Sequence, residues 1–154
     1  MPEANTQSRP QALKPVTEIR FRVRFFETDQ MRVVHHAAYL MWFEEGRSAF
    51  TRAIGYPYSQ MEQEGFSLAV AEVYARYHQS ARYDDEVVVR VCLEELKSRG
   101  MTFSYEIRRA ADDALLVTGS TKHISVDQEG RVKRIPPQIY ERLAAGIATL
   151  PVTG

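Results

Sequence analysis

The chain has 154 residues, of which 20 are Lys or Arg and 20 are Asp or Glu, so its formal net charge at pH 7 is zero. A length near 150 predicts one domain that buries about two-thirds of its unfolded surface, and the apolar fraction of 44% argues against disorder. The balanced charge argues against general nucleic-acid binding and leaves self-association open.

Residues 1–17 are polar, contain prolines and lack the apolar segment of a signal peptide. We interpret them as a flexible N-terminal tail before a single domain that spans 18–147. No stretch comes near 18 consecutive apolar residues, so we expect no membrane span. The only cysteine is Cys92, which excludes an intrachain disulfide, and we expect a cytoplasmic protein.

Residues 18–25 alternate between apolar and charged side chains, which predicts a half-buried strand. One face is expected to carry Ile19, Phe21, Val23 and Phe25, and the other Arg20, Arg22 and Arg24. The arginine row could bind phosphate, but we favour a solvated sheet face or pairing with carboxylates across the strands.

A loop is predicted over 27–36, and a long amphipathic helix over 37–54 with an apolar face that includes Trp42 and Phe43. Gly46 lies inside this helix, where glycine costs about 1 kcal/mol, and suggests the close approach of another backbone. A short second helix is expected before residue 64.

Four further strands are predicted over 66–78, 86–96, 101–109 and 115–126, with turn residues between them. Two prolines, Pro136 and Pro137, then open a closing helix. Strands in a run favour antiparallel pairing, so the predicted class is α+β with one helix packed on an antiparallel sheet.

Motifs for several common chemistries are absent. The sequence has no glycine-rich phosphate loop, no GxSxG and no HExxH, so nucleotide binding, a serine nucleophile and a metal site have no support. We expect neither a metal nor a resident cofactor.

The most distinctive segment places Asp29 in the loop and His36 immediately before the long helix. The first N–H groups of a helix are unpaired and carry partial positive charge, which suits an oxyanion, and Asp29 could act as a base or nucleophile. Composition and spacing alone favour the simpler interpretation, in which Asp29 is a turn residue and His36 only starts the helix.

The residues Thr28-Asp29, Val33-Val34-His35-His36, Tyr39-Leu40 and Trp42-Phe43-Glu44 resemble the signature of hot-dog-fold acyl-CoA thioesterases of the 4-hydroxybenzoyl-CoA thioesterase type. A second match is Ala81-Arg82-Tyr83-Asp84-Asp85, and the resemblance runs from about residue 18 to 143. It implies a hot-dog fold, in which a five-stranded antiparallel sheet wraps a long helix.

The resemblance also implies roles for particular residues. Asp29 falls on the catalytic aspartate, which attacks the thioester or activates water, and the backbone N–H of His36 falls on an oxyanion donor. Arg99, Arg131 and Lys133 match positions that meet the phosphates of CoA, although an ordinary solvated charge is an equal alternative for each. CoA enters as part of the substrate, and a homodimer or homotetramer with sites near the subunit interface is implied.

Two positions depart from the family pattern. Arg32 stands where glycine is usual, and it could narrow the site, add a charge or alter the turn that presents Asp29. Phe26 stands where many relatives carry tyrosine, so a hydroxyl is missing there.

The sequence therefore predicts an acyl-CoA thioesterase that hydrolyses a fatty or aromatic acyl-CoA. An acyl-CoA sensor without catalysis, on the same fold, is the alternative. A hot-dog dehydratase has less support, because residues 37–52 contain no histidine.

Overall fold

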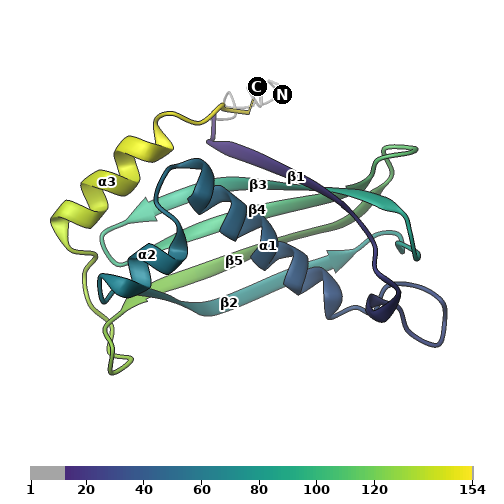
Figure 1. The fold of residues 1–154 in the computed structure, drawn as a ribbon, viewed down its shortest axis with the longest axis horizontal. Helices are drawn as coiled ribbons and strands as arrows, with labels where there is room; N and C mark the ends of the chain where they lie inside the picture. Colours follow the sequence, from purple (N-terminus) through teal and green to yellow (C-terminus); the bar gives the residue numbers. More distant parts are fainter. Residues whose placement is uncertain (1–12, 154) are drawn as a thin grey trace, which may run out of the picture.

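The computed structural model describes residues 13–153, which fold as one five-stranded antiparallel sheet with a long helix on one face (Figure 1). The strands are β1 (Val16–Arg22), β2 (Ser67–Tyr77), β3 (Glu86–Lys97), β4 (Gly100–Arg109) and β5 (Leu115–Val126). The helices are α1 (Ala38–Ala53), α2 (Tyr58–Gln63), α3 (Pro137–Ile147) and the 3-10 helix η1 (Phe25–Glu27). The order across the sheet is β1-β3-β4-β5-β2, so β1 and β2 form its edges.

The sheet confirms the predicted α+β class, and strands β2 to β5 begin and end within one residue of the predicted bounds. Over the first eight residues of β3 and of β4, half-buried residues alternate strictly with buried ones. Their buried side chains face α1, and no helix of residues 13–153 covers the opposite side of the sheet (Figure 1). Alternation could therefore locate these strands without knowledge of their partners.

Strand β1 differs from the prediction at both ends. It begins at Val16 rather than residue 18, because Val16 pairs with Cys92 and its N–H bonds Pro151 O at 2.9 Å. It ends at Arg22, and Phe25 lies in η1 with 75% of its surface exposed, so the predicted inward position of Phe25 is wrong. The favoured interpretation of the arginine row is confirmed, because all three arginines are exposed and Arg20 pairs with Glu86 of the neighbouring strand at 3.6 Å.

Helix α1 packs on the sheet through large side chains that are fully buried. Phe43 stacks on Tyr105 of β4 with ring centroids 4.2 Å apart, and Phe50 meets Phe103 edge-on at 5.3 Å. Removing one such ring costs about 3–5 kcal/mol, so this layer dominates the stability of the fold. At Gly46, a Cβ would lie 2.5 Å from Val91 Cγ2, so the glycine lets a side chain of the sheet pack closely against the helix. The predicted neighbour, another backbone, is therefore wrong.

The C-terminal segment completes the domain beyond residue 147. Helix α3 buries Ile139 and Leu143 against the core, and Leu150 packs beside them. The chain then returns to β1, where Val152 pairs with Pro15. The predicted domain therefore extends at both ends, while residues 1–12 of the predicted tail lie outside the described part. Within residues 13–153, no helix has the length and apolar character needed to cross a membrane.

Candidate active site

Asp29 lies in a tight hairpin between η1 and α1. Thr28 and Val34 form a bridge, Asp29 N–H donates to Val33 O and Arg32 N–H donates to Asp29 O, each at 2.9 Å. The side chain is also fixed, since Asp29 Oδ1 accepts a hydrogen bond from Met31 N–H at 2.8 Å. Asp29 Oδ1 therefore stabilises the turn. The side chain is half-buried, and its second oxygen, Oδ2, is available to bind or react.

The backbone of Arg32 explains why glycine is usual at this position. Its φ is +62°, in the left-handed region, where a Cβ costs about 1–2 kcal/mol. The hairpin forms its backbone hydrogen bonds with arginine at this position, so the chain accommodates the strain.

Glu27 is a buried residue that the sequence did not single out. Only 6% of it is exposed, and its carboxylate accepts hydrogen bonds from Trp42 Nε1 at 2.6 Å and Arg24 N at 2.8 Å. Burial alone would raise its pKa, but the bonds from Trp42 and Arg24 outweigh burial and hold the pKa below its usual value. Because Glu27 O also accepts from His35 N at 2.8 Å, this residue joins the hairpin to both η1 and α1.

His36 lies two residues before α1, because the helix begins at Ala38, one residue later than predicted, and Ala37 is its N-cap. The His36 ring stacks on that of His35 with centroids 4.2 Å apart, and the His36 carbonyl accepts a hydrogen bond from Tyr77 Oη at 2.8 Å. Among the hydrogen bonds of residues 13–153, none uses the backbone N–H of His36. An unpaired N–H at the start of a helix can donate to a negatively charged oxygen.

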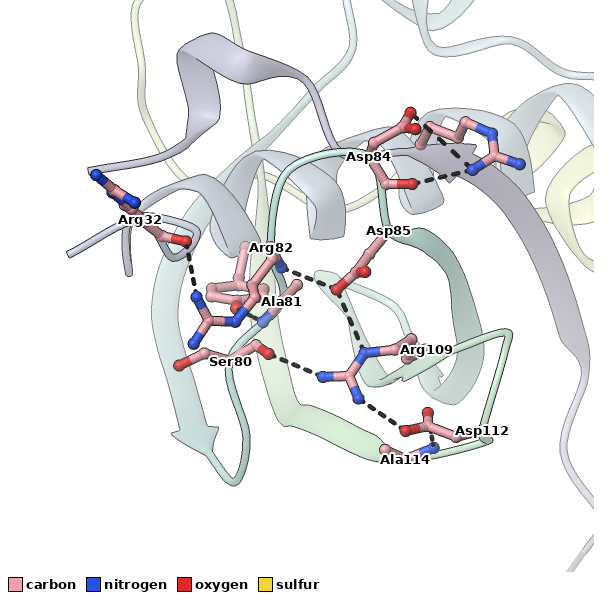
Figure 2. Close-up of polar contacts among 11 residues, drawn as sticks. Arg32, Ser80, Ala81, Arg82, Asp84, Asp85, Arg109, Asp112 and Ala114 are labelled. Atoms are coloured by element: carbon pink, nitrogen blue, oxygen red, sulfur yellow. Dashed lines mark hydrogen bonds and ion pairs between the residues drawn. The ribbon is translucent and has the colours of Figure 1, made fainter. Parts of the chain in front are cut away.

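The segment between β2 and β3, which includes the second motif, supports this hairpin from beneath (Figure 2). Ala81 O accepts from Val34 N–H, and Ala81 N–H donates to Tyr39 Oη. Arg109, the last residue of β4, reaches this segment (Figure 2). Its guanidinium donates to Ser80 O at 2.9 Å and pairs with Asp112 at 2.8 Å and Asp85 at 3.3 Å. The motif therefore acts structurally, by fixing the backbone that receives the hairpin.

The residues predicted to meet CoA phosphates lie at the other end of the sheet. Arg99 is exposed in the turn between β3 and β4, whereas the Asp29 hairpin lies at the end where β3 begins (Figure 1). The 12 residues of β3 span about 40 Å, so one chain does not bring these groups together. Lys133 lies near Arg99, since its N–H bonds Ser125 O and Ser125 N–H bonds Arg99 O. Arg131 is paired with Asp127 at 3.2 Å and Glu129 at 3.4 Å.

A cavity of about 240 Å³ lies on the open side of α1, among α1, β2, β4 and β5. It holds two polar residues that the sequence did not single out, Arg47 and the buried His123. His123 and Thr121 alternate with outward-facing residues on β5, and that alternation was the one available signal that both face inward.

Comparisons with known proteins agree with this geometry. A family model described as the Thioesterase-like superfamily matches residues 23–143. A protein of Aquifex aeolicus, named provisionally as an esterase, is 38% identical over 124 residues, which are 80% of this chain and 94% of the relative. YneP of Bacillus subtilis, named provisionally as an acyl-CoA thioesterase, is 34% identical over 114 residues, or 74% of this chain and 82% of its own. The crystal structure of DHNA-CoA thioesterase from Staphylococcus aureus has a TM-score of 0.77 and 28% identity, and the match covers 86% of this chain and 91% of that one.

A long helix on a five-stranded antiparallel sheet is the hot-dog architecture, and the family model and the solved thioesterase structure place the chain among hot-dog thioester hydrolases. The chain belongs to the thioesterase-like superfamily. This membership confirms the family, the fold and the class of enzyme predicted from the sequence.

Proposed function

We propose that the protein hydrolyses acyl-CoA to the free acid and CoA, with Asp29 and the backbone N–H of His36 as its catalytic groups. The observation that carries this proposal is the hydrogen-bonded hairpin, which fixes a half-buried carboxylate and leads directly into the unbonded N–H of His36, two residues before α1. The chemistry uses side-chain and backbone groups of the chain alone, and we place the enzyme in the cytoplasm.

Two routes lead to the same products. In the first, an Asp29 oxygen attacks the thioester carbon, the C–S bond breaks, CoA leaves as the thiolate, and water hydrolyses the resulting anhydride. In the second, Asp29 takes a proton from water as the water oxygen attacks the same carbon. In both, His36 N–H donates to the oxyanion, and one such donor contributes about 2.7–4 kcal/mol to catalysis.

The active unit in this proposal is a dimer formed through β2, alone or as half of a tetramer. Edge strand β1 is short and flanked by charged residues, which protects it from pairing, but β2 has 11 residues with only β5 beside it. On the face of β2 that points toward α1, Val70, Val73 and Tyr77 remain about half exposed. On the other face, Glu72 and Arg76 would meet their partner's Arg76 and Glu72 if two β2 strands paired antiparallel about Tyr74.

A dimer of this kind also reconciles the two separated groups of site residues. Antiparallel pairing about a two-fold axis places the Arg99 end of one subunit on the same side as the Asp29 end of its partner. Arg99 and Lys133 then serve the partner's thioester site through the CoA phosphates. Arg131 joins them only if phosphate displaces its two carboxylate partners.

Replacing Asp29 by Asn tests the catalytic role. Asn retains the oxygen that accepts from Met31 N–H, so the hairpin is preserved while the carboxylate is lost. We expect kcat to fall about 10²–10⁴-fold with little change in acyl-CoA affinity. Asp113→Asn, at an exposed loop carboxylate, is the matched control. Full hydrolysis by Asp29→Asn would overturn the role of Asp29, and binding without hydrolysis by the wild type would favour the sensor.

A further inference from the structure

The cavity beside α1 is lined mainly by apolar and aromatic side chains with a few polar groups. Its lining includes Arg47, Ser48, Val70, Met101, Phe103 and His123. Its volume of about 240 Å³ exceeds the roughly 150 Å³ that accommodates a benzene molecule, so it can hold one ring or a short chain.

A chain of hydrogen bonds leads from Arg47 to His123 beneath this cavity. Arg47 Nη1 and Tyr105 Oη are 3.2 Å apart, Tyr105 Oη and Thr121 Oγ1 are 2.6 Å apart, and Thr121 Oγ1 and His123 Nε2 are 2.8 Å apart. Arginine only donates, so Tyr105 Oη accepts a hydrogen bond from it, and the Tyr105 O–H donates to Thr121 Oγ1, its only other partner among residues 13–153. Thr121 then donates to Nε2, which leaves the imidazole proton on Nδ1.

The imidazole is neutral at physiological pH. Burial lowers the pKa of His123 to about 4, and the nearby charge of Arg47 adds to the effect. No hydrogen bond among residues 13–153 uses His123 Nδ1, so the cavity has a buried N–H donor available to a ligand.

Arg47 provides a second set of donors. It is half-buried, and within the described residues it forms no ion pair with a carboxylate, its one hydrogen bond going to Tyr105. Glu44, the other charged residue of the lining, is exposed and does not pair with it. The cavity therefore offers the Arg47 cation and the His123 N–H as donors beside the hydroxyls of its lining, and the unpaired cation favours a ligand oxygen that carries negative charge.

The cavity lies beside the partner's catalytic hairpin in the proposed dimer. Tyr77 near the end of β2 bonds His36, while Leu68 and Val70 near its start line the cavity. Antiparallel pairing of two β2 strands places the start of one against the end of the other. An acyl group attached to a thioester at the partner's His36 can then enter this cavity.

We propose that this cavity binds the acyl part of the substrate, and that Arg47 and His123 select a compact acyl group that ends in a carboxylate. This inference rests on the proposed thioesterase function and on the β2 dimer. Arg47 contacts the carboxylate directly, and the Tyr105–Thr121 pair positions the imidazole that donates to it.

The test compares matched substrates. Adipoyl-CoA and hexanoyl-CoA differ at the end of a chain, and 4-carboxybenzoyl-CoA and 4-methylbenzoyl-CoA differ on a ring. We expect the wild type to favour the carboxylate member of at least one pair by about tenfold in kcat/KM, and Arg47→Met to remove that preference. Arg52→Met removes an exposed arginine of the same helix that lies outside the cavity, so it is the matched control and should keep the preference.

A wild-type preference for the uncharged member of both pairs would overturn the inference and leave the thioesterase proposal intact. So would an unchanged preference in Arg47→Met. If the wild type hydrolyses none of the four, the thioesterase proposal fails. Calorimetry with S-(5-carboxypentyl)-CoA and S-hexyl-CoA then decides the inference: a carboxylate preference that Arg47→Met abolishes supports it, and equal affinities overturn it.

Discussion

The Asp29 hairpin and the open side of α1 differ in how many of their polar groups already have partners. In the hairpin, backbone bonds, the Asp29–Met31 contact and the Glu27–Trp42 bond fix nearly every group, and His36 N–H is left unbonded. On the open side, within residues 13–153, the outer edge of β2 pairs with no further strand and Arg47 pairs with no carboxylate. The first region is therefore organised by its own chain, whereas the second is organised to receive a ligand and a second subunit.

Disrupting the β2 edge should cause the largest change in activity, because it removes the contact that brings the two regions together. Val73→Asp puts a charge on the apolar face that the proposed dimer buries, so we expect monomers and a loss of activity of about 100-fold or more. Sedimentation and hydrolysis assays measure both. Val152→Asp, at an equally exposed valine near β1, should change neither, and a fully active monomeric Val73→Asp would contradict the shared site.

Glu27→Gln tests how far the hairpin depends on its internal bonds. Loss of the charged contacts to Arg24 and Trp42 should lower the free energy of unfolding by about 1–3 kcal/mol at pH 7. The folded pKa of Glu27 is depressed, so its contribution is complete above the unfolded pKa near about 4.3 and disappears as the pH falls through the folded value. Urea unfolding should therefore show that the difference in unfolding free energy between wild type and Glu27→Gln becomes smaller in acid. A difference that does not change with pH would refute the ionic role of Glu27.

The smallest expected effect is a gain at Arg32. Arg32→Gly removes the strain of φ +62°, partly offset by the greater freedom of glycine in the unfolded chain, so stability should rise by about 0.5–1 kcal/mol. Thermal unfolding measures this as a small increase in Tm, and Arg32→Ala should give no increase. A decrease in Arg32→Gly would mean that the arginine side chain itself stabilises the hairpin.

The same contrast separates what the sequence could predict from what it could not. Alternation and helical periodicity located β2 to β5 and α1, because each pattern depends on one face meeting the core. Phe25 was misplaced because the alternating pattern continues for three residues after the sheet has ended. Family resemblance, and not periodicity, pointed to Asp29 and His36.

Contacts between distant elements gave no signal. Glu27 lies in a predicted loop, and nothing local indicates that Trp42 will bury its carboxylate. The bonds from Arg47 to Tyr105 and from Tyr105 to Thr121 depend on how α1, β4 and β5 meet. The distance between Asp29 and Arg99 likewise follows from the direction of β3 in the sheet.

Mixing two inactive variants tests most directly the central claim, that each site joins the Asp29 hairpin of one subunit to the cavity of the other. Asp29→Asn removes the carboxylate, and Ser48→Trp fills the cavity. Random reassociation makes half of the dimers mixed, each with one intact site, so the mixture should recover about a quarter of wild-type activity. A mixture no more active than the sum of its two components would contradict the account.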